Sequence, residues 1–199
     1  GLAVRDCAPG LALIAHWNLR EPRSPYNLRL SLPVRAPAPE SMTPALNKAL
    51  PEFEAFATGG VKFTPSAFLG RMVVLYFYPK DDTPGCTTEA MQFRDHHKEF
   101  VKAGAAIFGV SRDNLVSHDK FKEKLELPFE LIADTEEKLC HMFGVVKNKI
   151  MYGKKVKGIE RSTFLIDANG VLCAEWRGLK VAGHVDEVLK AVKLQKKVA

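Results

Sequence analysis

The chain has 199 residues and a mass of 22.1 kDa, of which 46% are hydrophobic and 26% charged. These values are typical of a globular protein with a sizeable core, and no run approaches the roughly 18 apolar residues of a membrane-spanning helix, so we expect no membrane partner. The net charge of +6 is spread along the chain except at 147–158 and 193–197, which favours a mildly basic enzyme over a nucleic-acid-binding protein.

The composition changes near residue 41. Residues 1–41 contain five arginines, six prolines and no lysine, whereas every lysine follows Met42. Arginine-rich, acid-poor segments are typical of organelle-targeting peptides, but the prolines here would break a long amphipathic helix. We interpret residues 1–41 as an irregular N-terminal extension, either a leader or a segment of foreign origin. Residues 42–199 are predicted to form one domain.

From residue 71 onward, buried strands alternate with helices. Residues 71–79 form a continuous apolar, β-branched and aromatic run, which predicts a strand covered on both faces. A helix is expected from residue 83 to about 102. The same pattern then continues with a strand at 105–111, a helix at 114–127 ended by Pro128, a strand at 129–134 and a short helix within 135–145.

The C-terminal part begins with a hairpin signal. Residues 162–176 predict two strands around the turn Asn169-Gly170, and residues 184–195 predict a closing helix with one apolar face. Helix-linked strands followed by a hairpin and a last helix predict an α/β fold with a central mixed β-sheet flanked by helices.

The four cysteines, at positions 7, 86, 140 and 173, are far apart. They form no Cys-x-x-Cys pair and no cluster with histidine at metal-ligand spacing. The neighbouring histidines 96 and 97 would point about 100° apart on a helix, which does not suit a shared metal. We therefore expect neither a disulfide scaffold nor a metal site, and a reducing, cytoplasmic location.

Cys86 has the local context of a reactive thiol. Thr83 is a good N-cap and Pro84 is favoured at the first helical position, which makes Cys86 the third helical residue. Lowering a cysteine pKa by two units from about 8.5 requires about 2.7 kcal/mol. A helix terminus supplies about 1–2 kcal/mol, so a nearby cation is also expected. The alternative is a small buried thiol without reactivity, and these residues alone leave both interpretations open.

The stretch "VVLYFYPKDDTPGCT" (73–87) resembles the active site of the peroxiredoxins, specifically the bacterioferritin comigratory protein or PrxQ subfamily. Their motif Pro-x-x-x-Thr-x-x-Cys is matched by Pro79, Thr83 and Cys86. Similarity continues through "FGVSRD" and "MYGKKVKGIERSTFLID" and covers roughly residues 50–193, whereas residues 1–41 match nothing in the pattern. The resemblance implies a thioredoxin-like fold and a thiol-dependent peroxidase that reduces hydrogen peroxide and organic hydroperoxides.

The resemblance also assigns roles within the site. Cys86 would be the peroxidatic nucleophile, and the Thr83 hydroxyl would hydrogen-bond the thiolate and the peroxide. Pro79 would shield the pocket from water. Arg161, which read alone is an exposed charge at a strand end, would be the expected cation and would hold a peroxide oxygen. No metal or organic cofactor is expected, because sulfur carries both electrons.

Many members of this subfamily have a resolving cysteine five residues after the peroxidatic one, but here that position is Met91. The sulfenic acid must then be resolved by an external thiol, in a one-cysteine cycle, or by another internal cysteine. Cys140 is the strongest internal candidate, although both Cys140 and Cys173 fit small buried residues, and Cys7 lies in the extension. We expect a monomer recycled by thioredoxin, glutaredoxin or glutathione.

Two other functions share these features. A thioredoxin-like disulfide oxidoreductase would share the fold, but position 89 is glutamate where a Cys-x-x-Cys motif needs its second thiol. A redox-sensing chaperone would share the reactive thiol without fast turnover.

Overall fold

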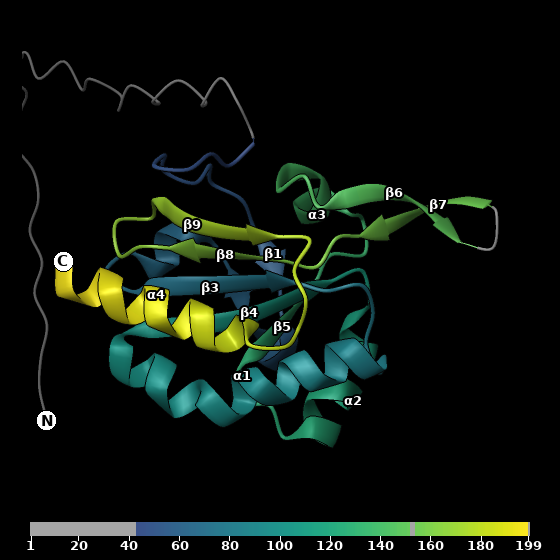
Figure 1. Ribbon diagram of the computed structural model, residues 1–199, viewed down its shortest axis with the longest axis horizontal. Coiled ribbons are helices and arrows are strands. Elements are labelled where there is room, and N and C mark those ends of the chain that lie inside the picture. Colours follow the sequence, from purple (N-terminus) through teal and green to yellow (C-terminus); the bar gives the residue numbers. More distant parts are fainter. Residues whose placement is uncertain (1–42, 152–153, 199) are drawn as a thin grey trace, which may run out of the picture. The chain divides into compact units, whose positions relative to one another are not determined.

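The computed structural model describes residues 43–151 and 154–198. Its central sheet has the strand order β5-β4-β3-β8-β9 (Figure 1). The strands are β3 (Met72–Phe77), β4 (Ala105–Ser111), β5 (Glu130–Ala133), β8 (Ser162–Ile166) and β9 (Leu172–Arg177). β3, β4 and β5 are parallel, whereas β8 is antiparallel to β3 and β9 is antiparallel to β8. The mixed sheet confirms the predicted α/β class.

The central strand β3 is buried on both faces, as its sequence predicted. Its alternate side chains belong to two separate cores, because successive residues of a strand point to opposite faces. One core contains Met72, Val74 and Tyr76, and the other contains Val73, Leu75 and Phe77. A strand with this environment is a rigid base for whatever follows its carboxyl end.

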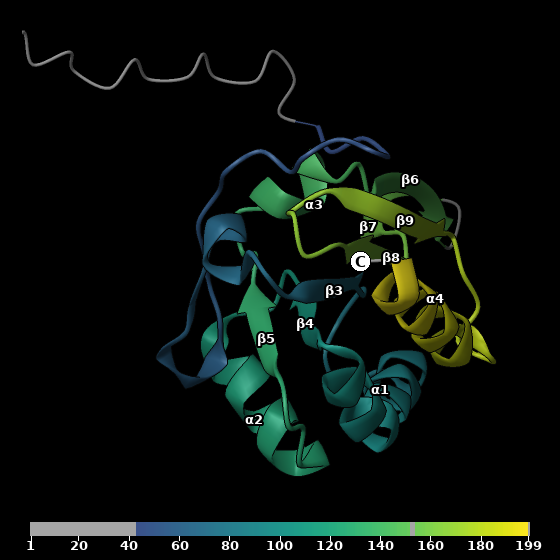
Figure 2. The same cartoon turned by 90° about the vertical axis from the view of Figure 1, so that its left-hand side faces the viewer.

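Three helices cover one face of the sheet and a short one covers the other (Figure 2). α1 (Pro84–Ala103), α2 (Leu115–Leu125) and α4 (His184–Val198) contribute apolar side chains to the first core. α3 (Lys138–Met142) packs with the second core. Cys86 on α1 and Cys140 on α3 therefore lie in different cores, on opposite faces of the sheet.

The helix ends refine two predictions. The helix expected at 114–127 spans Leu115–Leu125; the Asn114 side chain accepts a hydrogen bond from the Ser117 N–H at its start, and Glu126 adopts a left-handed conformation at its end. The helix expected within 135–145 is reduced to α3, because Glu137 before it and Gly144 after it both have positive φ. No helix in the described residues is long and apolar enough to cross a membrane.

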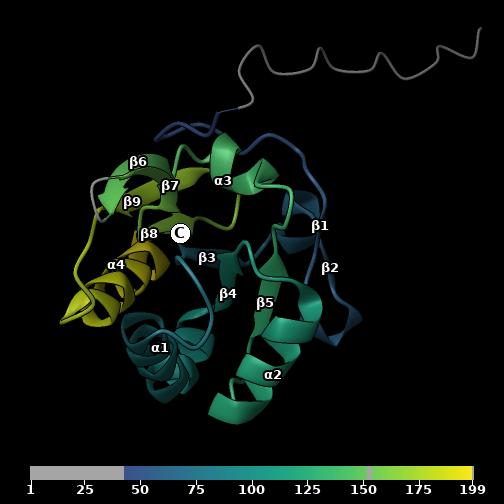
Figure 3. The same ribbon diagram turned by 90° about the vertical axis from the view of Figure 1, so that its right-hand side faces the viewer.

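Several elements were not predicted. β1 (Ala55–Phe56) pairs with β2 (Lys62–Phe63); the 3-10 helix η1 (Thr58–Gly60) lies between them, and the 3-10 helix η2 (Pro65–Phe68) follows β2. β6 (Val146–Met151) and β7 (Lys154–Ile159) form an antiparallel hairpin in the basic stretch (Figure 3). The interpretation of residues 1–41 as an irregular extension lies outside the described residues.

Candidate active site

Cys86 lies in the first turn of α1, just after the carboxyl end of the central strand. Thr83 is the N-cap residue and Pro84 the first helical residue, so Cys86 is the third, as predicted. Its side chain is 1% exposed. At this position a thiol lies beside backbone N–H groups that have no helical partner and beside the positive end of the helix dipole.

Arg161 is brought to Cys86 by the pairing of β8 with β3. Phe77, at the end of β3, is opposite Ser162, at the start of β8, so Arg161 lies next to the start of α1. Its Nη2 donates a hydrogen bond to the Cys86 Sγ at 3.2 Å, across 75 positions of sequence. The backbone of Gly85 also lies close to this guanidinium, because a Cβ built on Gly85 would be 3.4 Å from the same Nη2. The expected cation is therefore beside the thiol.

Glu89 is a third member of the cluster that the sequence analysis did not single out. Arg161 Nη1 donates to Glu89 Oε2, and the Glu89 side chain is fully buried. Its Oε1 has no hydrogen-bond partner among the described residues. Burial raises the pKa of Glu89 to about 7, against the opposing charge and hydrogen bond of Arg161. The i, i+3 spacing of Cys86 and Glu89 on one helix face was the available sequence signal.

Thr83 and Pro79 lie in the segment between β3 and α1, whereas Arg161 is the residue before β8. The Thr83 hydroxyl donates to the carbonyl oxygen of Lys80 at 3.0 Å. Because a hydroxyl has only one proton, it does not donate to the Cys86 sulfur in this conformation. The Thr83 side chain also makes no capping hydrogen bond to α1. Pro79 is half-buried in the loop between β3 and α1.

The other described cysteines have different surroundings. All three cysteines of the described ranges are free. Cys140 is completely buried, and burial, followed by the charge of Asp134, raises the pKa of its thiol. Cys173 is half-buried on β9 and donates a hydrogen bond to the Leu165 carbonyl at 3.3 Å; burial raises its pKa to about 11. Cys7 lies outside the described residues.

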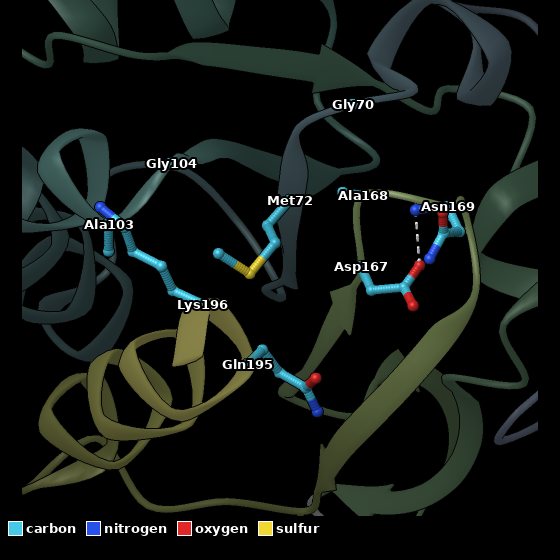
Figure 4. Close-up of a pocket in the computed structure, with 9 residues that line it drawn as sticks. All are labelled: Gly70, Met72, Ala103, Gly104, Asp167, Ala168, Asn169, Gln195 and Lys196. Carbon is cyan, nitrogen blue, oxygen red and sulfur yellow. Dashed lines mark hydrogen bonds between the residues drawn. The ribbon is translucent and has the colours of Figure 1, made fainter. Parts of the chain in front are cut away.

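A cavity of about 300 Å³ lies at the opposite end of the sheet (Figure 4). Gly70 and Met72 line it at the start of β3, Gly104 lines it before β4, and residues 167–169 line it after β8. Cys86 follows the other end of β3, so this cavity is not the thiol site. The residues 43–151 and 154–198 contain no group of three or more histidine, cysteine or acidic side chains suited to a metal ion.

Comparison with known proteins identifies the family. Residues 46–174 match the model of the AhpC/TSA family. The protein called peroxiredoxin Bcp from Xanthomonas campestris is 53% identical over 140 residues, which cover 70% of this chain and 88% of that protein. This chain belongs to the AhpC/TSA family. The peroxiredoxin resemblance seen in the sequence is thereby confirmed, including its Bcp, or PrxQ, type.

Two further peroxiredoxins are informative, one about the fold of this chain and one about how much of its length is matched. A structure of the X. campestris bacterioferritin comigratory protein, described as giving insights into alkyl peroxide reduction, has a TM-score of 0.69 and 50% identity, and covers 72% of this chain and 92% of that one. The peroxiredoxin Q, chloroplastic, of rice is 35% identical over 187 residues, covering 92% of this chain and 84% of that protein. That coverage cannot be reached without part of residues 1–41.

The peroxiredoxin match confirms the thioredoxin-like fold and the enzyme class. The chain is a thiol peroxidase, an oxidoreductase that acts on peroxides and is recycled by a thiol reductant.

Proposed function

We propose that Cys86 is the peroxidatic nucleophile and that this peroxiredoxin reduces hydrogen peroxide and organic hydroperoxides. The observation that carries the proposal is the Arg161 guanidinium 3.2 Å from the Cys86 sulfur, at the start of a long helix. A cation and a helix N-terminus both favour a thiolate over a thiol. The alkyl peroxide reduction named for the X. campestris relative supports organic hydroperoxides as substrates.

The chemistry begins when the Cys86 thiolate attacks the terminal peroxide oxygen. An S–O bond forms, the O–O bond breaks, and the leaving hydroxide or alkoxide takes a proton to become water or an alcohol. Arg161 stabilises the negative charge that develops on the leaving oxygen. The Thr83 hydroxyl joins by rotating away from the Lys80 carbonyl, and Pro79 keeps water from the pocket. Cys86 is left as a sulfenic acid.

Recycling follows a one-cysteine cycle. An external thiol attacks the sulfenic sulfur, water leaves, and a mixed disulfide forms; a second thiol then releases Cys86 and forms the reductant's disulfide. Met91 at the usual resolving position and the placement of Cys140 on the opposite face of the sheet support this cycle. The reductant is a thioredoxin- or glutaredoxin-type protein or glutathione, and no metal or organic cofactor takes part.

The test is peroxide consumption with each reductant. Wild type and the Cys140→Ser control should turn over alike, whereas Cys86→Ser should be inactive. Intact mass after one equivalent of peroxide should show one added oxygen, trapped by a sulfenic-acid reagent. A stalled Cys140→Ser variant, with loss of two thiols per peroxide and a Cys86–Cys140 cross-link in wild type, would instead make Cys140 the resolving cysteine.

The same preparation separates the rival activities. A disulfide oxidoreductase would reduce insulin disulfides faster than peroxide, but it needs a second thiol where this chain has the buried Glu89. A redox-sensing chaperone would suppress aggregation of an unfolding client after oxidation and would show only one peroxide turnover. We expect neither result.

For assembly and location, we propose a monomer in a reducing, cytoplasmic compartment, with no nucleic-acid or membrane partner. The competing proposal is that residues 1–41 direct the protein to an organelle, and the match to the chloroplastic rice protein supports it. A fusion of residues 1–41 to a fluorescent protein decides between them: diffuse cytoplasmic signal supports the first proposal, and organellar signal the second. Light scattering of the complete chain tests the monomer.

A further inference from the structure

The loop of residues 78–83 joins β3 to α1 and contains a buried acid that the peroxidase chemistry does not use. Asp81 is only 5% exposed, although Lys80 and Asp82 on either side of it are exposed. A carboxylate in such a position is costly unless donors compensate for its lost hydration. The groups that donate hydrogen bonds to Asp81 therefore show which parts of the protein hold the loop in place.

Asp81 is held by Tyr78 within the loop and by groups from two other parts of the fold. Its carboxylate accepts hydrogen bonds from the Tyr78 hydroxyl at 2.8 Å, the Ser117 hydroxyl at 2.7 Å and His118 Nδ1 at 2.9 Å. Its backbone N–H donates to Asp113 Oδ2 at 2.9 Å. Burial raises the pKa of Asp81, but the hydrogen bond and charge of His118 outweigh it, and the pKa falls below its usual value. The loop is thus tied to the segment after β4 and to α2.

His118 has an acceptor at each ring nitrogen. Nδ1 faces the Asp81 carboxylate at 2.9 Å, and Nε2 faces the carbonyl oxygen of Ile132 on β5 at 3.2 Å. The side chain is completely buried. His118 therefore joins the Asp81 loop to β5 through a buried side chain with a hydrogen-bond contact at each ring nitrogen.

We propose that Asp81 and His118 form a buried hydrogen-bonded pin that holds the Cys86 loop closed for the peroxide step and restrains its opening for the recycling step. Both are positioning residues: they touch the loop and the sheet, not the sulfur. The inference rests on the proposed function of Cys86, and adds to it a device that sets the balance between the two half-reactions.

The two half-reactions need different states of this loop. Peroxide reacts with Cys86 when Thr83, Pro79 and Arg161 surround the sulfur, which is the closed state. A reductant thiol is larger, and the Cys86 side chain is 1% exposed, so the first turn of α1 must open before that thiol can attack. The pin lowers the fraction of open molecules. Its loss therefore slows oxidation by peroxide and speeds reduction of the sulfenic acid.

The variants are Asp81→Asn and His118→Gln, with Ser117→Ala as a milder one that removes a single donor. Asp134→Asn is the matched control, because Asp134 is a buried carboxylate that accepts from the backbone of α3 in the other core. Stopped-flow mixing measures the peroxide step, and a chromogenic small thiol measures reduction of the preformed sulfenic acid. Hydrogen exchange of residues 79–90 reports opening.

Loss of one hydrogen bond to a charged group should slow the peroxide step about tenfold in Asp81→Asn and His118→Gln. Reduction of the sulfenic acid should become several-fold faster, with faster exchange confined to residues 79–90, and Ser117→Ala should change both rates in the same directions by less. The control should leave both rates at the wild-type values.

Equal slowing of both half-reactions, or wild-type rates in all three variants, would overturn the pin. A wild-type protein that consumes no peroxide would instead contradict the proposed function, while hydrogen exchange would still report whether Asp81 and His118 hold the loop.

Discussion

Cys86 and Cys140 occupy the same position in two different helices. Each is the third residue, Cys86 of the 20-residue α1 and Cys140 of the 5-residue α3, and each is buried. Beside Cys86 lies the guanidinium of Arg161. Beside Cys140 lies the carboxylate of Asp134, which accepts hydrogen bonds from the N–H groups of Leu139 and Cys140 itself.

The comparison shows that the same position in a helix can have opposite electrostatic surroundings. At α3 the free N–H groups are already bonded to the Asp134 carboxylate, whose negative charge disfavours a second anion. At α1 the donors and the nearby cation act in the same direction. The two cysteines therefore differ in the charge of the nearest side chain, which is a cation at Cys86 and an anion at Cys140.

Removing the Arg161 guanidinium should have the largest effect on the difference between the surroundings of Cys86 and Cys140. Arg161→Ala should slow the reaction with peroxide by about 10²–10³-fold, because a donor to the developing charge is lost. Since this change leaves the Glu89 carboxylate buried and unpaired, Arg161→Ala combined with Glu89→Gln keeps the cluster neutral and should be equally slow.

The matched control for Arg161 is Arg112→Ala, which removes the guanidinium on the Cys140 side, where it pairs with Glu137. Stopped-flow oxidation by peroxide should be unchanged in this control. Wild-type kinetics in Arg161→Ala would remove Arg161 from the chemistry.

A second prediction concerns Glu89, the buried acid near Cys86, and the pH dependence of the protein's stability. The pKa of Glu89 is raised from 4.5 to about 7 in the folded state, so folding favours its protonated form. Its contribution to stability is complete below about pH 4.5, decreases as pH rises to about 7 and is constant above, a total of about 3 kcal/mol. Urea unfolding of wild type and Glu89→Gln between pH 4.5 and 8 measures it. An identical pH dependence in both proteins would mean that Glu89 does not titrate in this range.

A third prediction compares the hydroxyl of Thr83, at the site, with that of Thr88, further along the helix. Thr83→Val should slow the peroxide step about tenfold through the lost hydrogen bond to charge, whereas Thr83→Ser should retain most of the activity. Thr88→Val is the control. Like the Thr83 hydroxyl, the Thr88 hydroxyl donates a hydrogen bond to a nearby backbone carbonyl, that of Pro84 at 2.9 Å, but it is exposed to solvent. Equal rates for Thr83→Val and Thr83→Ser would show that the hydroxyl takes no part.

Local sequence signals predicted several elements of the fold well, at the site and away from it. The apolar run of β3, the Thr83-Pro84 start of α1 and the Asn169-Gly170 turn each depend on neighbouring residues, and each was placed correctly. The β6–β7 hairpin was missed because its many lysines conceal the alternation that indicates a strand, and its pairing comes from the partner strand.

The sequence by itself determined that Cys86 starts a helix after a buried strand, and its motif indicated the peroxiredoxin family. Only the tertiary structure decided which charges surround that thiol. Arg161 reaches Cys86 through strand pairing across 75 residues, Glu89 is buried by the packing of α1, and Cys140 is placed in the other core. Helix starts and turns follow from adjacent residues, whereas burial and ion pairing depend on groups that only the folded chain brings together.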